Sequence, residues 1–358
     1  MDRIIDLAPG DTLLVRVAAA AEAPPTPSPP PSFVNWFVDP VLGSDSNDGH
    51  VKPLRTLQKA LDLAQPGSTI HLAPGLYKQD AITKHNGPIT ITGPQAAILN
   101  GNGAARIFEV NHSHYTLQGF TIDGKKAGAT STYRDKLLYF QGKIPFVGLT
   151  GAKVLGMTLK NAGGEALRLR YYVRDSEIAF CTIGPCGIHD FVQNGGGKNG
   201  EGIYVGTSSN QWADGKNPEP GPDKTTGVWI HDNNINTQGN EAVDIKEGAS
   251  GILVENNFAT GQKDPESAGF DSRGDNNIFR GNQSLGNMGA GFRLGGHTVG
   301  GHVYGVGNEI TGNSIHDNAK GGVKVMVSPQ GKICGNTTAN NVGGDSVGDF
   351  PCNPTGVC

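Results

Sequence analysis

The feature that most constrains this chain is a repeat of 23 to 25 residues. Segments such as VWIHDNNIN, ILVENNFAT and GKICGNTTA align on a small or polar residue that precedes a turn. This period fits one coil of a parallel β-solenoid, because the leucine framework of a leucine-rich repeat is absent and a propeller blade needs about 40 residues. We therefore predict a single-stranded right-handed parallel β-helix, in which one turn column stacks. The column contains Phe120, Met157, Cys181, Asn233, Asn257, Asn282, Asn313 and Asn336.

A second set of repeats reveals the two faces of one strand in each coil. It comprises GEALRLR, GEGIYVG, NEAVDIK, AGFDSRG, AGFRLGG and GGVKVMV. Alternate residues of a strand point to opposite sides of the sheet, and one side here is almost wholly apolar. These apolar positions, which we expect to stack as the core, are Leu167, Ile203, Val243, Phe270, Phe292 and Val323, followed by Leu169, Val205, Ile245, Ser272, Leu294 and Val325.

The other side of the same strands carries charged and aromatic residues, and it is the candidate functional face. Its first column contains Glu165, Glu201 and Glu241. Its second column contains Arg168, Tyr204, Asp244, Asp271, Arg293 and Lys324. Its third column contains Arg170, Gly206, Lys246, Arg273 and Gly295.

Composition excludes several classes of protein. Glycine contributes 54 of 358 residues, hydrophobic residues 36% and charged residues 17%. These values exclude a coiled coil, an all-helical bundle and a charged disordered chain. The net charge of −4 provides no basic field for nucleic acid, and no apolar stretch approaches the ~18 residues of a membrane span. We expect a monomer without a nucleic-acid or membrane partner.

The chain divides into four predicted parts. Residues 1–23 form a short N-terminal segment, and residues 24–32, which include PPTPSPPPS, form a proline-rich linker. Residues 33–341 form the β-helix catalytic domain, with an amphipathic helix at Leu54–Ala64 that caps its first coil. Residues 342–358 form a cysteine-containing tail.

The cysteines favour an oxidising compartment. Three of the five lie in the last 25 residues, where a disulfide would tether the tail. We expect Cys334 to pair with Cys352 or Cys358, and Cys181 to be a buried thiol, with a bridge to Cys186 left open. This pattern favours a secreted or extracellular protein, although charged residues interrupt positions 1–21 and leave no clear signal peptide.

Four outward carboxylates predict a metal site. Neighbouring coils lie ~4.8 Å apart, so Glu201, Glu241, Asp244 and Asp271 fall within one patch. Carboxylates this close repel one another unless a cation neutralises them, and Ca²⁺ is the hard cation that oxygen ligands suit best. The alternative is that arginine side chains or solvent screen the charges.

A basic stripe beside the carboxylates predicts binding of an acidic polysaccharide. Lys246 and Arg273 share one column on successive coils, and the insertion Thr207–Thr226 is expected to form a wall beside them. This arrangement suits β-elimination of a uronate, because neutralising the sugar carboxylate makes the C5 proton removable. We expect Arg273 to lower the pKa of Lys246 so that it can act as the base. The residues predicted to bind substrate are Arg168, Tyr204, Arg293, His297 and Lys324.

The sequence resembles the right-handed parallel β-helix polysaccharide lyases, nearest to the alginate lyase and chondroitinase B family. The opening segment FVDPVLGSDSNDG…PLRTLQKALDLAQPGSTIHLAPGLY resembles the common start of that superfamily. NEAVDIKEGASGILVENN, followed one coil later by GFDSRGDNN, resembles its lysine and arginine coils. The resemblance implies that Lys246 is the Brønsted base, that Arg273 is the acid or orients the carboxylate, and that Glu241 and Asp244 bind calcium. It implies alginate as the first candidate substrate, followed by pectate or a glycosaminoglycan.

Three alternatives remain on the same fold. A C5-epimerase would show an Asp-Pro-His-Asp run, to which Gly187-Ile188-His189-Asp190 is the nearest match. A glycoside hydrolase would use paired acids such as Asp244 and Asp271. A non-catalytic glycan-binding β-helix, of the tail-spike or adhesin kind, would fit the proline-rich N-terminal joint. Only a lyase generates an unsaturated uronate that absorbs in the near ultraviolet.

Overall fold

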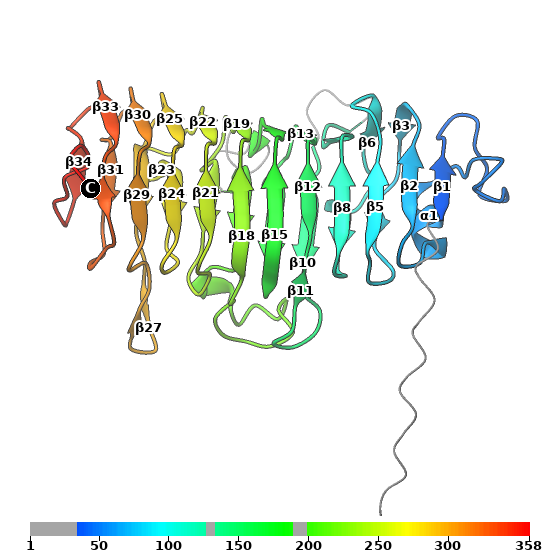
Figure 1. Ribbon diagram of the computed structural model, residues 1–358, viewed down its shortest axis with the longest axis horizontal. Helices are drawn as coiled ribbons and strands as arrows, with labels where there is room; N and C mark the ends of the chain where they lie inside the picture. Colours follow the sequence, from blue (N-terminus) through cyan, green and yellow to red (C-terminus); the bar gives the residue numbers. More distant parts are fainter. Residues whose placement is uncertain (1–33, 127–132, 189–198) are drawn as a thin grey trace, which may run out of the picture. The chain divides into compact units, whose positions relative to one another are not determined.

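The computed structural model describes residues 34–126, 133–188 and 199–358. The predicted N-terminal segment 1–23, the linker 24–32 and His189 lie outside these residues. Within the unit Ser32–Cys358, the chain winds through three parallel sheets, and each strand pairs with a strand of the neighbouring coil (Figure 1). The predicted parallel β-helix is confirmed.

Sheet A has twelve strands and includes β1, the first strand of the described chain. Its strands are β1 (Asn35–Val38), β2 (Thr69–Leu72), β5 (Ile89–Thr92), β8 (Tyr115–Gln118), β12 (Lys153–Leu155), β15 (Val173–Ala179), β18 (Thr226–His231), β21 (Leu253–Glu255), β24 (Ile278–Arg280), β29 (Glu309–Thr311) and β32 (Ile333–Cys334), with β11 (Leu149–Thr150) paired to β15. Figure 1 shows these strands side by side in chain order.

Sheets B and C complete each coil. Sheet B comprises β3 (Gly75–Tyr77), β6 (Ala97–Leu99), β9 (Thr121–Asp123), β13 (Thr158–Lys160), β16 (Thr182–Ile183), β19 (Asn234–Asn236), β22 (Phe258–Thr260), β25 (Gln283–Leu285), β30 (Ser314–His316) and β33 (Thr337–Ala339). Sheet C comprises β4 (Ala81–Ile82), β7 (Arg106–Val110), β10 (Lys136–Gln141), β14 (Leu167–Arg170), β17 (Ile203–Val205), β20 (Val243–Ile245), β23 (Ala268–Ser272), β26 (Ala290–Leu294), β31 (Val323–Val325) and β34 (Ser346–Gly348). Because β34 pairs with β31, sheet C continues seven residues past the predicted boundary at residue 341.

The capping helix is shorter than predicted. Helix α1 spans Leu57–Leu63, and the Thr56 hydroxyl caps it by accepting a hydrogen bond from the backbone N–H of Lys59. Leu54 lies outside the helix because it forms a parallel β-bridge with Val38. Leu57, Ala60 and Leu61 are buried, so the helix covers the first coil, as the sequence predicted.

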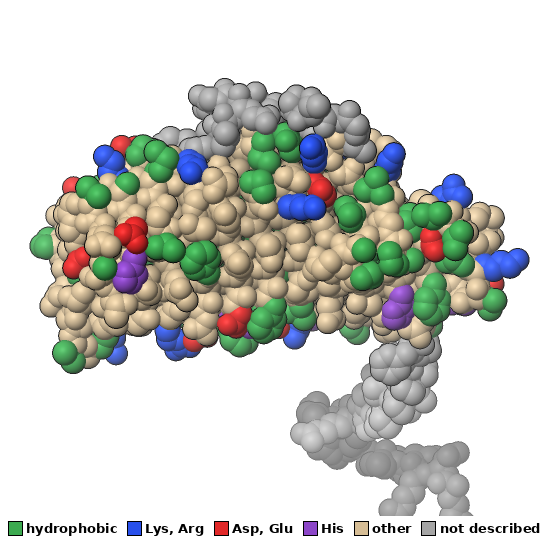
Figure 2. All heavy atoms as spheres, turned by 90° about the horizontal axis from the view of Figure 1, so that it is seen from above, with side chains coloured by type: hydrophobic (Ala, Val, Ile, Leu, Met, Phe, Trp, Pro, Cys, Tyr) green, Lys and Arg blue, Asp and Glu red, His purple; other side chains and the backbone are tan. Residues whose placement is uncertain are grey.

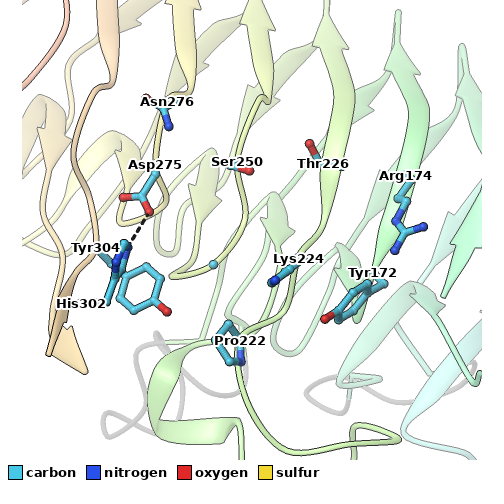
Figure 3. Close-up of a pocket in the computed structure, with 11 residues that line it drawn as sticks. Tyr172, Arg174, Pro222, Lys224, Thr226, Ser250, Asp275, Asn276, His302 and Tyr304 are labelled. Carbon is cyan, nitrogen blue, oxygen red and sulfur yellow. Dashed lines mark hydrogen bonds and ion pairs between the residues drawn. The ribbon is translucent and has the colours of Figure 1, made fainter. Parts of the chain in front are cut away.

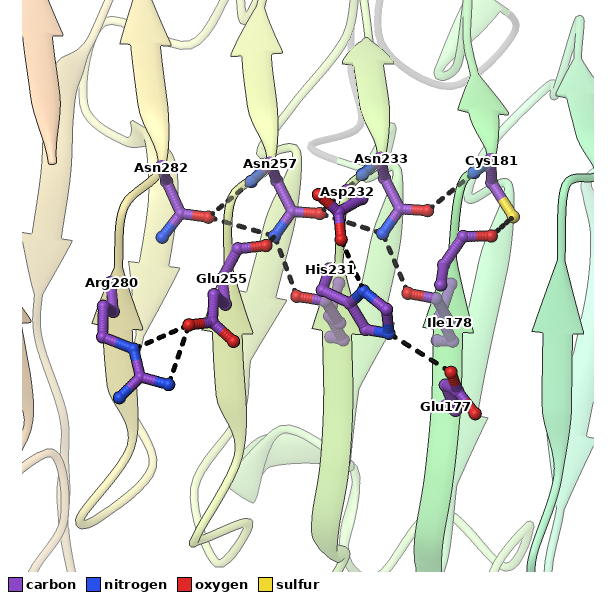
Figure 4. Close-up of polar contacts among 12 residues, drawn as sticks. Glu177, Ile178, Cys181, His231, Asp232, Asn233, Glu255, Asn257, Arg280 and Asn282 are labelled. Carbon is purple, nitrogen blue, oxygen red and sulfur yellow. Dashed lines mark hydrogen bonds and ion pairs between the residues drawn. The ribbon is translucent and has the colours of Figure 1, made fainter.

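The predicted asparagine column forms a ladder of hydrogen bonds along the coils (Figure 4). Each side-chain N–H donates to the next Oδ1, at 2.9 Å from Asn233 to Asn257 and 3.0 Å from Asn257 to Asn282. The backbone N–H of Cys181 starts the ladder by donating to Oδ1 of Asn233. The ladder continues through Asn313 and Asn336.

Two further ladders stabilise other corners and were not predicted. Oδ1 of Asn318 accepts a hydrogen bond from Asn287 at 2.9 Å, and Oδ1 of Asn341 accepts one from Asn318 at 3.0 Å. At another corner the backbone N–H of Asn277 donates to Oδ1 of Asn308. The first of these ladders had a signal in the sequence, because Asn282, Asn313 and Asn336 are each followed five residues later by another asparagine.

The cysteines follow one of the two predicted pairings. A disulfide joins Cys334 to Cys358 and ties the chain end to the last coils. Cys181 and Cys186 are separate buried thiols, and Cys352 is a partly exposed thiol. Burial raises the pKa of Cys181 to about 12, so this thiol is unreactive at neutral pH.

The face outside sheet B differs from the predicted functional face. Figure 2 shows backbone and neutral polar side chains over most of this surface, with charged side chains scattered among them. No helix among the described residues is long and apolar enough to span a membrane.

The asparagine ladder can be tested by removing one inner member. Asn257→Ala removes the acceptor of the buried backbone N–H of Asn233 and the side-chain donor to the carbonyl of Ile230. We expect it to destabilise the fold by about 3 kcal/mol. The control is Asn234→Ala, which removes an exposed side chain from β19 and is expected to change stability by less than about 0.5 kcal/mol. Chemical denaturation measures both. Equal stability of the two variants would contradict the importance of the ladder.

Candidate active site

The register of sheet C aligns the charged residues as the sequence predicted. Tyr204 pairs with Asp244, Asp244 with Asp271, and Asp271 with Arg293, on successive strands. Arg293 pairs in turn with Lys324. The apolar columns between them are buried, and Phe270 stacks on Phe292 with ring centroids 4.9 Å apart inside the coil.

Three of the four predicted carboxylates converge. Glu201, Glu241 and Asp244 are buried, and one oxygen of each lies within 4.8 Å of the others. Burial, reinforced by the neighbouring carboxylates, raises the pKa of Glu201 to about 8 and that of Glu241 to about 7. Burial likewise raises the pKa of Asp244. Each group therefore resists holding its charge without a cation nearby.

The cluster fits a hard cation. Oε2 of Glu241 and Oδ1 of Asp244 are buried and lack a hydrogen-bond partner among the described residues. Buried carboxylate oxygens of this kind are the ligands that Ca²⁺ prefers. Asp271, the fourth predicted ligand, is not in the cluster because Arg293 binds both of its oxygens, at 2.9 Å and 2.6 Å.

Lys246 lies between a carboxylate and an aromatic ring. It forms an ion pair with Asp244, and its Nζ lies 4.6 Å from the ring centroid of Tyr204. Arg168 lies over the same ring at 4.1 Å. Burial alone would lower the pKa of Lys246, but the charge of Asp244 outweighs burial and raises it. The prediction that the pKa of Lys246 is lowered is therefore wrong for the protein without a bound cation.

Arg273 is held by a network that the sequence analysis missed. Its Nη1 lies 3.4 Å from Oε1 of Glu247, which also pairs with Nδ1 of His297. The other oxygen of Glu247 accepts a hydrogen bond from the backbone N–H of Ser209 at 3.1 Å. Glu247 directly follows Lys246 in the sequence, and this adjacency was the available signal.

A pocket of about 360 Å³ opens beside Arg273. Arg293, His297 and Lys324 line it together with Arg273. Arg293 is already bound to Asp271 and to the carbonyl of Glu266, whereas Lys324 has no ion-pair partner among the described residues. Arg273, His297 and Lys324 therefore present the positive charge and hydrogen-bond donors that an anion would meet.

Arg168 and Arg170 anchor the insertion between β17 and β18. Arg168 donates to Gln211 at 2.7 Å and pairs with Glu165 at 2.9 Å. Arg170 donates to Asn217 at 2.6 Å and pairs with an aspartate of the same insertion. Arg168 is buried by these contacts, and it also lines a pocket of about 460 Å³. Its predicted role in binding substrate stays a prediction.

A family model described as "Right handed beta helix region" matches residues 172–351, which is half of the chain. The chain belongs to the right-handed β-helix family. A second model, described as a protein of unknown function (DUF1565), matches residues 41–200. No curated protein sequence matches the chain significantly.

Solved β-helix structures resemble this one in fold. An alginate lyase from Paenibacillus sp. str. FPU-7 superposes with a TM-score of 0.66 and 22% identity, covering 82% of this chain and 95% of that one. A GH136 lacto-N-biosidase from Eubacterium ramulus gives 0.56 and 13%, with coverages of 88% and 67%. Pectate lyase Pel9A gives 0.51 and 15%, with coverages of 85% and 70%. This β-helix therefore has the fold of polysaccharide lyases, and a glycoside hydrolase shares it.

The role of Glu247 in this β-helix predicts a pH-dependent stability. Burial opposes its charge, but Arg273 and hydrogen bonds to the carboxylate outweigh burial and lower the pKa of Glu247. A lowered carboxyl pKa stabilises the fold above the unfolded-state value, and this contribution is lost as the pH falls through the folded-state value. Glu247→Gln should therefore cost about 3 kcal/mol at neutral pH.

The same substitution should cost much less in acid, where the wild-type carboxylate is also protonated. Melting temperatures of both proteins, measured across the acidic range in which they remain folded, check this. A melting-temperature difference that stays constant with pH would contradict the ion pair.

Proposed function

We propose that the protein is a polysaccharide lyase that cleaves a uronic-acid-containing polysaccharide by β-elimination. The observation that supports this most is the position of Lys246 and Arg273, which directly follow the paired strands β20 and β23. Lys246 contacts the cluster of buried carboxylates, and Arg273 lines the basic pocket. A base, a fixed cation and a candidate metal site within one outward patch are what removal of a proton α to a carboxylate needs.

Each residue has a role in the proposed reaction. Arg273, with Lys324 beside it, binds the uronate carboxylate and stabilises the charge that develops on it. Cation binding at Asp244 would weaken the ion pair between Asp244 and Lys246 and so favour the neutral amine. Neutral Lys246 takes the C5 proton, the C4–O4 bond breaks, and a C4=C5 double bond forms. Tyr204 is the candidate donor of a proton to the departing O4, since burial raises its pKa to about 12 and keeps the hydroxyl protonated.

The carboxylate cluster is the proposed calcium site. Glu201, Glu241 and Asp244 would hold Ca²⁺, which would neutralise their charge and polarise the substrate carboxylate. Asp271 supports the site indirectly, because it fixes the guanidinium of Arg293 beside Glu241.

We propose alginate as the first substrate to test, followed by pectate and glycosaminoglycans. The alginate lyase that superposes with 95% of its length on this chain supports this order. We also propose that the protein is secreted, because the disulfide between Cys334 and Cys358 suits an oxidising compartment.

The proposal is tested by screening these polymers for a product that absorbs in the near ultraviolet. On the polymer that is cleaved, Lys246→Ala should lower kcat by about 10²–10⁴-fold, since it removes a general base. Arg273→Ala should lower kcat comparably, because it removes charge stabilisation.

Lys246→Arg separates catalysis from structure. Arginine keeps the positive charge beside Asp244 but does not give up its proton at neutral pH, so the variant should fold and stay inactive. Lys332→Ala, an exposed lysine elsewhere, is the matched control and should behave as wild type. Near-full activity of Lys246→Arg would rule out Lys246 as the base.

A further inference from the structure

A pocket of about 720 Å³ lies apart from the pocket beside Arg273. The two share no lining residue. The large pocket lies where sheet C turns into sheet A, beneath the insertion and the hairpin of β27 (Thr298–Val299) and β28 (His302–Val303). Trp212 of the insertion contacts Tyr304 beside the hairpin, with ring centroids 5.5 Å apart. Tyr304 in turn lines the large pocket.

The floor of this pocket is a row of polar side chains on successive coils. Arg174 pairs with Thr226, Thr226 with Ser250, and Ser250 with Asp275, all in parallel register. Three strand spacings of ~4.8 Å make the row about 14 Å long, which is longer than a single sugar ring. The repeat along the row suits an extended ligand with a repeating structure.

A tyrosine lies at each end of the row, and one of the two has a strained backbone conformation. Tyr172 and Tyr304 lie at opposite ends of the pocket (Figure 3). Tyr171 and Tyr172 have φ values of 66° and 56°, which is costly for residues other than glycine. The buried carboxylate of Asp223 stabilises this turn by accepting hydrogen bonds from both backbone N–H groups, at 2.6 Å and 2.8 Å. Both rings are mostly buried, and the part of each that lines the pocket offers apolar surface to a sugar ring.

The charges of the lining residues favour an anionic ligand. Asp275 is the acidic residue among the lining residues, and its carboxylate contacts the His302 ring at 3.3 Å and accepts hydrogen bonds from two backbone N–H groups at 2.7 Å and 3.0 Å. Lys224 is exposed and has no partner among the described residues. Arg174 uses one guanidinium nitrogen for the carbonyl of Phe146 and leaves other donors free. Figure 3 shows Lys224 between the two tyrosines.

We propose that this pocket is a second glycan-binding site, which holds an acidic oligosaccharide away from the site of cleavage. The tyrosine rings pack against sugar faces, the Thr226 and Ser250 hydroxyls bond sugar hydroxyls, and Lys224 and Arg174 bind carboxylates. The choice of a uronate as the ligand rests on the proposed function. A second site of this kind retains a long polymer on the protein between cleavage events.

The test measures binding to full-length protein that carries Lys246→Ala, so that no ligand is cleaved. The probe is a saturated alginate pentasaccharide, titrated by calorimetry, with cellopentaose as the neutral counterpart. We expect Lys224→Ala to weaken one binding event about 10-fold and Lys224→Glu to abolish it. Lys78→Ala, an exposed lysine on another coil, is the matched control and should change nothing.

The outcomes separate the second site from the lyase activity. If pentasaccharide binding depends on Lys224 but the protein forms no unsaturated product from any polymer, the second site is supported and the lyase proposal is wrong. If the protein forms an unsaturated product but Lys224→Glu leaves pentasaccharide binding unchanged, the lyase proposal stands and the second site is wrong. Absence of pentasaccharide binding, or equal binding of cellopentaose at the Lys224-dependent site, overturns the second site.

Discussion

The stacking of one coil on the next is the constraint on which the rest of this structure depends. Parallel strand pairing places successive coils ~4.8 Å apart. Asparagine ladders join the corners of successive coils by hydrogen bonds. A side chain in one coil therefore lies directly above its counterpart in the next. Because the register is rigid, residues 22 to 40 positions apart in the sequence become neighbours in one column of sheet C.

That rigid register also explains how so many charges lie close together on one face. Burial, together with neighbouring carboxylates, raises the pKa values of Glu201, Glu241 and Asp244, which would destabilise an isolated cluster. Lys246 and the Arg293–Asp271 pair supply opposite charge around them. Burying this many charged groups has a cost in desolvation free energy. Clusters of groups with shifted pKa values occur preferentially at functional sites.

The repeats predicted the columns but not the contacts made from them. Period and alternation placed Asp244, Asp271 and Arg293 in one column, because strand geometry alone determines that. Which neighbour each charge pairs with depends on side-chain reach and on the insertion between β17 and β18, and neither follows from the repeat. Asp271 therefore binds Arg293 instead of joining the cluster. Arg168 contacts Gln211 of the insertion, a partner that the repeat did not predict.

The same limit applies to the groups that the sequence analysis missed. Asp223, Gln211 and Trp212 lie in an insertion without repeat partners, so no column predicted their positions. Glu247 falls just after a strand, where the alternation of faces no longer determines the direction of a side chain. Its contact with Arg273 depends on the stacking of two neighbouring coils, which the alternation within one strand does not describe.

The central claim is that the charged face of sheet C breaks a glycosidic bond by elimination. The most direct test is to digest the cleaved polymer in heavy-oxygen water and to weigh the products by mass spectrometry. Elimination adds no water, so the product masses should sum to the substrate mass and carry no heavy oxygen from the solvent. A hydrolase on this fold would add one water per cleavage and place heavy oxygen at each new reducing end, and that result would contradict the account.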